Sequence, residues 1–117
     1  MGELFELAAF TRDPSGGNPA GVWIGAALPA ESEMLQIARE LGYSETAFLA
    51  DVAPHRKQVR YFSPEGEVSF CGHATVAAGV QLGFQGGPAT YLFETAVGEV
   101  PVVVLEKDGL MTATLTS

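Results

Sequence analysis

The hydrophobic and polar positions of this chain predict short strands and two helices. In residues 31–41, Met34, Ile37, Ala38 and Leu41 recur at helical spacing while the charged residues fall between them, which predicts an amphipathic helix. Gly42 follows directly, and glycine is favoured just after a helix because it adopts the left-handed conformation. Apolar runs separated by turn-forming residues predict strands at 3–11, 21–28, 45–51, 57–63, 67–70, 89–98, 99–109 and 110–117.

Residues 68–93 contain no Asp, Glu, Lys or Arg. Five interruptions, Gly79, Gly83, Gly86, Gly87 and Pro88, argue against a membrane span. Within this segment, residues 74–84 are apolar nearly all round, and a helix without a polar face must be buried on every side. The predicted fold class is therefore α+β, with a curled, mostly antiparallel sheet around a buried central helix. A second helix lies outside, and all of 1–117 forms one domain.

Composition narrows the function classes. The 117 residues carry 14 acidic and 6 basic side chains, a net charge of −8, without a basic run. Nucleic acids and anionic membrane surfaces are therefore not expected as partners, and we interpret the acidity as a contribution to solubility. A single cysteine cannot form an internal disulfide, and the first ten residues lack the basic start of a signal peptide. Both features favour a reducing, cytoplasmic location.

The segment Phe70-Cys71-Gly72-His73-Ala74-Thr75 stands where a strand is predicted to end and the buried helix to begin. The unpaired N–H groups of a first helical turn form a site for an anion, and a small carboxylate is the natural ligand. Gly72 would let that ligand approach the backbone, and His73 could donate a hydrogen bond or a proton. The alternative is that Cys71 is a buried apolar side chain and His73 a helix cap. Zinc is disfavoured because Cys71, His73 and the distant His55 lack ligand spacing.

Two further segments carry polar groups. Glu45 lies between two hydroxyl residues, Ser44 and Thr46, at the start of an apolar strand, where a desolvated carboxyl can exchange protons near neutral pH. The base-rate alternative is a surface charge. Asn18 lies in the segment 16–22, which is either a simple turn or a turn that orients a ligand, and spacing does not decide between these.

Together these segments resemble the PhzF-like isomerases of phenazine biosynthesis, across essentially the whole chain. The matching residues are Gly17-Asn18-Pro19-Ala20-Gly21-Val22, Ser44-Glu45-Thr46-Ala47-Phe48, Arg60, Phe62, Pro64, Glu67 and Phe70-Cys71-Gly72-His73-Ala74-Thr75. Ser63 departs from the threonine that the family has more often.

The resemblance implies the diaminopimelate-epimerase-like fold, in which two similar lobes enclose a ligand between the N-termini of their central helices. It also implies an isomerase without metal or organic cofactor, which moves a hydrogen within a hydroxylated dihydroaromatic acid. By this resemblance Glu45 is the acid/base and His73 handles protons. Substrate contact falls to Asn18, Ser44, Gly72, Ala74 and Thr75.

The family pattern includes a second lobe, and we find no second copy of the motif in this chain. The expectation is a single N-terminal lobe, completed by another chain or by self-association, for instance as a C2 dimer. One alternative chemistry is that of two-thiol racemases and epimerases, with Cys71 as one thiol; His73 departs from the asparagine typical of those enzymes. Another alternative is a non-catalytic lobe that binds a carboxylate or serves in assembly.

Overall fold

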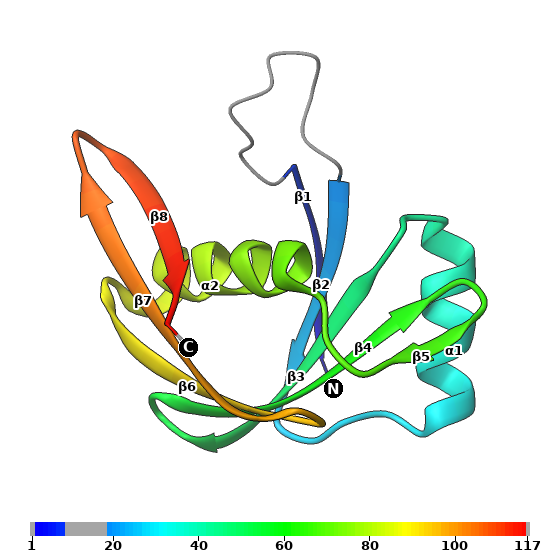
Figure 1. Ribbon diagram of the computed structural model, residues 1–117. Helices are drawn as coiled ribbons and strands as arrows, with labels where there is room; N and C mark the ends of the chain where they lie inside the picture. The colour runs from blue at the N-terminus through cyan, green and yellow to red at the C-terminus, as the bar shows by residue number, and fades with distance from the viewer. Residues whose placement is uncertain (1, 9–18, 117) are drawn as a thin grey trace.

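In the computed structural model, which describes residues 2–8 and 19–116, one mixed sheet curls around a central helix (Figure 1). The strands run in the order β1-β2-β3-β4-β6-β7-β8, with β5 paired to β4. The elements are β1 (Glu3–Ala8), β2 (Pro19–Gly25), α1 (Glu31–Leu41), β3 (Thr46–Ala53), β4 (Arg56–Ser63), β5 (Gly66–Val68), α2 (Gly72–Gly86), β6 (Ala89–Thr95), β7 (Gly98–Lys107) and β8 (Leu110–Leu115).

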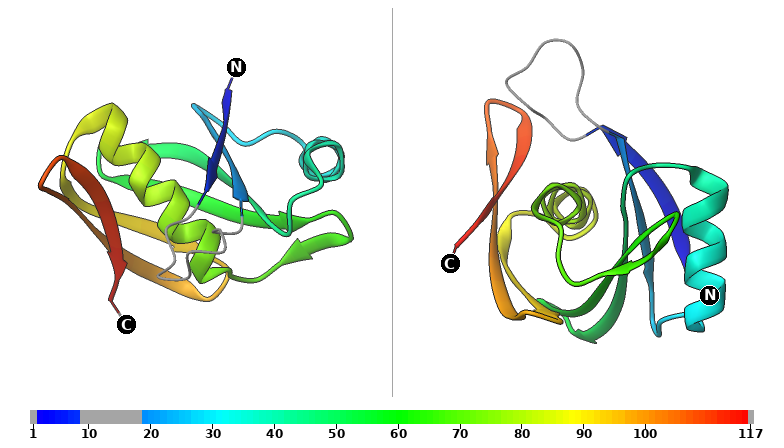
Figure 2. Two further views of the ribbon diagram at one scale, coloured as in Figure 1. Left: turned by 90° about the horizontal axis from the view of Figure 1, so that it is seen from above. Right: turned by 45° about the vertical axis from the view of Figure 1, so that its right-hand side comes forward.

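Most neighbouring strands are antiparallel, as predicted. The exceptions are β2 with β3 and β4 with β6, which pair in parallel. The helix α1 connects β2 to β3, and α2 lies in the connection that leads to β6, so each parallel pair is bridged by a crossover containing a helix. Viewed along α2, the strands surround the helix while α1 lies outside the sheet (Figure 2). The predicted fold class is confirmed.

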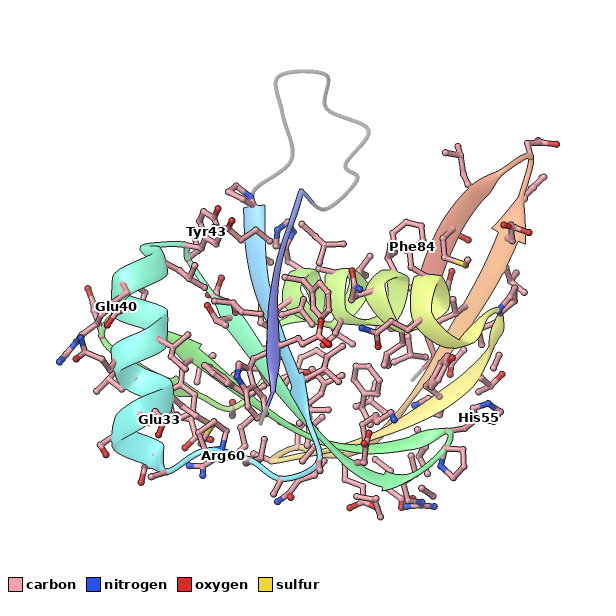
Figure 3. The ribbon with its side chains drawn as sticks, turned by 180° about the vertical axis from the view of Figure 1, so that it is seen from behind. Glu33, Glu40, Tyr43, His55, Arg60 and Phe84 are labelled. Carbon is pink, nitrogen blue, oxygen red and sulfur yellow. The ribbon has the colours of Figure 1, made fainter. Side chains whose placement is uncertain are left out.

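The central helix α2 is buried along most of its length, as its charge-free sequence predicts. Two glycines let β7 and β8 approach its backbone closely. A β-carbon on Gly79 would lie 2.8 Å from Ala113 Cβ, and one on Gly83 would lie 2.6 Å from the Met111 side chain. The prediction that the helix is buried on every side is wrong at its C-terminal end, where Phe84 is 64% exposed (Figure 3). The helix also extends two residues beyond each predicted end.

The outer helix α1 occupies the predicted range, residues 31–41. Its apolar face buries Met34 and Ala38 against Phe48 of β3 and Phe62 of β4, whose rings meet edge to face at 5.6 Å. Gly42 ends the helix with a φ of 72°, in the left-handed region that only glycine adopts without cost. The two helices therefore pack on opposite faces of the same sheet.

Strand β3 separates these two faces residue by residue. Ala47 and Leu49 belong to the core around α2, whereas Phe48 belongs to the core under α1. Because side chains alternate along an extended chain, Glu45, immediately before the strand, falls on the same face as Ala47. The strand thus directs this glutamate towards α2 and away from α1.

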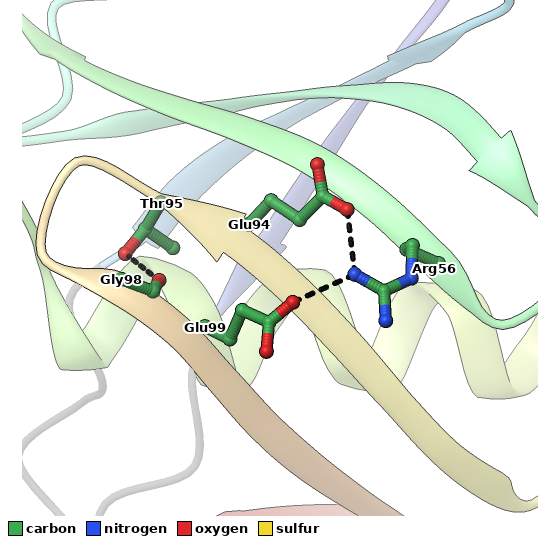
Figure 4. A network of polar contacts seen from close by, with 5 residues as sticks. All are labelled: Arg56, Glu94, Thr95, Gly98 and Glu99. Atoms are coloured by element: carbon green, nitrogen blue, oxygen red, sulfur yellow. Dashed lines mark hydrogen bonds and ion pairs between the residues drawn. The ribbon is translucent and has the colours of Figure 1, made fainter.

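Tight turns and surface ion pairs complete the sheet. Asp108 and Gly109 both have positive φ, 54° and 80°, as a two-residue hairpin turn between β7 and β8 requires. Arg56 of β4 forms ion pairs with Glu94 of β6 and Glu99 of β7, at 2.7 and 2.8 Å (Figure 4). These groups are well exposed, so the pairs contribute little stability.

Within residues 2–8 and 19–116, no helix is long and apolar enough to cross a membrane.

Candidate active site

The first turn of α2 is capped by the only cysteine of the chain. Cys71 has an extended backbone, and its Sγ accepts a hydrogen bond from the Ala74 backbone N–H at 3.5 Å. The Thr75 N–H donates to the Cys71 carbonyl at 3.0 Å, which is the first hydrogen bond of the helix. The sequence interpretations of Cys71 were a buried apolar side chain and a thiol at a ligand site; in the structure Cys71 is half-buried and its thiol caps the helix.

The buried hydroxyl groups of Thr75 and Tyr61 support the same turn through hydrogen bonds. The Thr75 hydroxyl donates to the Cys71 carbonyl oxygen at 2.7 Å, and it lies 2.5 Å from the Tyr61 hydroxyl. Tyr61 is 1% exposed, and its ring packs against Phe70 in a T-shaped contact at 5.5 Å. Tyr61 of β4 thus contacts Phe70, which precedes Cys71, and Thr75, which follows it one helical turn later.

Glu45 lies beside the capping thiol. Burial raises the pKa of the Cys71 thiol, and the charge of Glu45 and its hydrogen bonding to the thiol add to this rise, while backbone N–H groups of the first turn oppose it. The Glu45 backbone carbonyl accepts a long hydrogen bond of 3.4 Å from the Gly21 N–H, which continues the pairing of β2 with β3. Glu45 is half-buried, and its carboxyl interacts with the thiol at the start of α2.

The predicted site residues divide into three groups. Glu45, Gly72 and His73 are half-buried at or beside the start of α2, and Ser44 next to them is exposed. Ala74 and Thr75 are fully buried, and the Thr75 hydroxyl is already hydrogen-bonded, so neither offers side-chain surface to a ligand. The substrate contacts predicted for these two residues therefore have no side-chain support. Asn18 lies outside the described residues.

Gly72, at the first position of the helix, has room for a side-chain methyl group. A β-carbon there would meet nothing closer than Leu115 Cδ1, at 3.7 Å, which is ordinary van der Waals contact. The conformation of this residue also does not demand glycine, because its φ is not in the left-handed region. Gly72 is therefore not required by packing, in contrast to Gly79 and Gly83 farther along the helix.

The described residues contain no group of three or more His, Cys, Asp or Glu side chains that could hold a metal ion. The two histidines are far apart. His55 lies in the turn between β3 and β4 with its ring 5.2 Å from that of Tyr91, whose hydroxyl reaches the C-terminal end of α2 (Figure 3). His73 lies at the N-terminal end, and a helix of 15 residues is about 22 Å long.

Residues 7–117 match the family model described as phenazine biosynthesis-like protein, PhzC-PhzF. The chain belongs to the PhzC-PhzF family. An uncharacterised isomerase of Bacillus subtilis, YfhB, is 41% identical over 116 residues, which is 97% of this chain and 40% of YfhB. The PhzC-PhzF family therefore accounts for the whole region that carries the motifs.

Solved structures agree with this membership. A PhzF-family protein of Bacillus anthracis matches 96% of this chain and 39% of its own, with a TM-score of 0.81 and 33% identity. A predicted epimerase of Pseudomonas aeruginosa, at 24% identity and a TM-score of 0.85, shares the fold. The chain thus spans about 40% of the length of these relatives and of YfhB.

Within the PhzC-PhzF motif block, the residues before the helix have structural contacts. Arg60 forms a two-point ion pair with Glu67, at 2.8 Å from Nε and 2.5 Å from Nη2, and so connects β4 to β5. The guanidinium also lies 5.5 Å above the Phe62 ring and 3.5 Å from Glu31 of α1. These residues stabilise the outer side of the sheet, whereas Cys71 interacts with Glu45.

Sequence reasoning missed Tyr61 and the capping role of Cys71. Cysteine is not among the preferred N-cap residues, and sulfur is a weak acceptor, so no capping signal was present. Tyr61 reads as one more aromatic residue of a buried strand, because the partner of its hydroxyl is 14 residues away. The contact can be recognised only once the fold places the Tyr61 side chain of β4 against Thr75 of α2.

Proposed function

We propose that this chain provides one half of the active site of a cofactor-independent isomerase. The reaction would move a proton within a small carboxylate-bearing substrate of dihydroaromatic type. Membership of the PhzC-PhzF family and the isomerase name of YfhB support the reaction class. The observation that carries the proposal is the position of the Glu45 carboxyl beside the thiol that caps α2.

The start of α2 would bind the substrate carboxylate. The first turn of a helix presents backbone N–H groups and the positive end of the helix dipole, and both favour an anion. The lack of a side chain at Gly72 would allow close approach to the backbone, and His73 at the next position would hydrogen-bond to the bound group. Ser44 beside Glu45 would supply a further hydroxyl contact, and Asn18, which precedes β2 in the sequence, would supply another.

Glu45 would act as the acid/base. Its ionised carboxylate would take a proton from one carbon of the substrate, and the resulting carboxylic acid would return a proton at another carbon. No proton is gained or lost overall, so neither an oxidant nor a reductant is required. A single carboxyl suffices if the two carbons lie on the same side of the bound substrate.

A second lobe would close the other side of the cleft. One half of a cleft neither excludes water nor places donors on both sides of a substrate, so large rate enhancement requires the other half. The chain spans 40% of YfhB, which leaves room in the relatives for a lobe of comparable size. We propose that this lobe comes from further polypeptide, from a second chain or from a second copy in a C2 dimer.

Two-thiol chemistry with Cys71 is the second candidate. Its support is the position of the thiol at the helix start and the fold shared with a hydroxyproline epimerase of Agrobacterium vitis, at 18% identity and a TM-score of 0.67. The base in that chemistry is a thiolate, and the raised pKa of the Cys71 thiol disfavours this form. We therefore favour Glu45 as the base.

The test is proton exchange catalysed by the assembly that contains both lobes. A hydroxylated dihydroaromatic acid is incubated in D2O, and deuterium incorporation is followed by NMR for the wild type, Glu45→Gln and Glu33→Gln. Glu33 is an exposed residue of α1 and serves as the matched control (Figure 3). We expect Glu45→Gln to lose at least a hundredfold in rate, the usual contribution of a general acid/base, and Glu33→Gln to lose none.

Full turnover by Glu45→Gln would rule out the acid/base role. Loss of activity after treatment with iodoacetamide, with Glu45→Gln still active, would favour the thiol chemistry. A non-catalytic lobe is tested by titrating the chain with 3-hydroxybenzoate, a stable aromatic hydroxy acid. Shifts of the Gly72 and His73 amide signals without turnover in any assembly would indicate binding alone.

A further inference from the structure

Tyr61 contacts both ends of the segment from Phe70 to Thr75. Its ring packs on Phe70 at 5.5 Å, and its hydroxyl lies 2.5 Å from Thr75 Oγ1. The ring is fully buried between β4 and α2 and belongs to the core around α2. Tyr61 therefore spans the turn that carries Cys71, Gly72 and His73 without itself reaching the surface.

The direction of the hydrogen bonds follows from the chemistry of the partners. The Cys71 carbonyl oxygen only accepts, so the single hydroxyl proton of Thr75 is used for the 2.7 Å contact with that carbonyl. Thr75 Oγ1 must then accept the proton of the Tyr61 hydroxyl. The result is a directed chain from Tyr61 through Thr75 to the backbone of Cys71, and every polar atom in it is satisfied.

We propose that Tyr61, acting through the Thr75 hydroxyl, is a positioning residue that fixes the first turn of α2 opposite Glu45. This inference rests on the proposed function, because the turn is the part of the site that would bind the substrate carboxylate. Tyr61 has no contact with a ligand in this proposal. It sets the orientation of the Cys71 carbonyl, and through it the capping thiol and the backbone N–H groups at Gly72 and His73.

Cysteine is a weak helix cap, which gives this support a physical purpose. The Sγ of Cys71 accepts from Ala74 at 3.5 Å, longer than the bond that a serine or aspartate cap would make. Besides that contact, the backbone bond from the Thr75 N–H to the Cys71 carbonyl closes the turn, and helix ends fray when so few bonds hold them. The side-chain bond from Thr75 to the same carbonyl adds a third connection across the turn, and the Tyr61 hydroxyl holds Thr75 in the required rotamer.

The same helix supplies a matched control at its other end. Tyr91 is 2% exposed, and its hydroxyl donates to the carbonyls of Gly87 and Leu82, at 3.1 and 3.4 Å. Tyr91→Phe therefore removes a tyrosine hydroxyl that bonds to α2, as Tyr61→Phe does, without touching the first turn. A role of Tyr61 in core stability alone predicts that the two variants behave alike at Cys71.

The experiment measures the accessibility of the first turn in the chain itself. Hydrogen exchange of the Ala74 and Thr75 amides and the pH profile of Cys71 alkylation by iodoacetamide are recorded for the wild type, Tyr61→Phe and Tyr91→Phe. A lost hydrogen bond is worth about fivefold in a local opening equilibrium. We expect about fivefold faster exchange at these amides and faster alkylation of Cys71 in Tyr61→Phe, with Tyr91→Phe close to the wild type.

Thr75 provides the second arm. Thr75→Val removes the hydroxyl and should reproduce the effect of Tyr61→Phe, whereas Thr75→Ser keeps the hydroxyl and should restore wild-type protection. The comparison of Thr75→Val with Thr75→Ser also tests the positioning role if Tyr61→Phe does not fold. Equal effects of Tyr61→Phe and Tyr91→Phe, or protection in Thr75→Val equal to that in Thr75→Ser, would overturn the proposal. Neither readout depends on catalysis, so failure of this inference is distinguishable from failure of the acid/base role of Glu45.

Discussion

Replacing Gly79 with alanine tests the close contact between α2 and the β7–β8 hairpin. In an unobstructed helix this change stabilises a protein by about 1 kcal/mol, because glycine is a poor helix former. Here the new β-carbon would lie 2.8 Å from Ala113 Cβ and 2.9 Å from Val102 Cγ1. Ala113 Cβ is fixed to the backbone and valine is stiff at χ1, so backbone must move. Such overpacking costs about 1–3 kcal/mol.

The net expectation is a destabilisation of about 1 kcal/mol. Urea unfolding followed by far-UV circular dichroism measures it as a lower midpoint at unchanged slope. Gly72→Ala is the control, because it adds the same methyl group to the same helix where the nearest atom is 3.7 Å away. If Gly79→Ala were more stable than the wild type by about 1 kcal/mol, the close approach of β7 and β8 to α2 would be refuted.

Two further predictions concern pH and ligand binding. Burial raises the pKa of Tyr61 to about 12 from an ordinary 10.0, so folding favours the protonated phenol. The stability that this group contributes is complete below pH 10 and is lost as the pH rises from 10 to about 12. Tyr61→Phe should flatten this decline when urea midpoints are measured across that range. An unchanged decline in Tyr61→Phe would contradict the prediction. Gly72→Ala should keep the free energy of unfolding within about 0.5 kcal/mol of the wild type, because the methyl group would make only ordinary contact with Leu115 Cδ1 at 3.7 Å. It should weaken the response of the His73 amide to 3-hydroxybenzoate, because the proposed function brings the ligand close to the backbone at this position. Unchanged affinity in Gly72→Ala would place the ligand elsewhere.

The sequence pattern was sufficient for the helices because their signals are local. The outer helix has apolar residues at helical spacing and a glycine at its end, and both are determined within residues 31–42. The central helix was recognisable by its lack of charge, although the same lack wrongly predicted burial of Phe84. An apolar pattern indicates that a side chain favours burial, but in the described structure the sheet does not extend over Phe84.

The candidate site was predictable only in part. The segments around Glu45 and Cys71 were identified from residue chemistry and family resemblance, and the structure brings them together. The burial of Thr75 and the support from Tyr61 were not predictable, because they depend on how β4 lies under α2. The cytoplasmic location, the absence of a cofactor and the second lobe stay predictions.

The central claim, that the Glu45 carboxyl lies against the start of α2, is tested most directly by titrating the Cys71 thiol. The rate of alkylation by iodoacetamide is measured against pH for the wild type, Glu45→Gln and the control Glu33→Gln. Because Glu45 contributes to the raised pKa of the thiol, its neutralisation should lower that pKa and speed alkylation near pH 8, while Glu33→Gln leaves the profile unchanged. Identical profiles for the wild type and Glu45→Gln would show that the carboxyl is remote from the helix start.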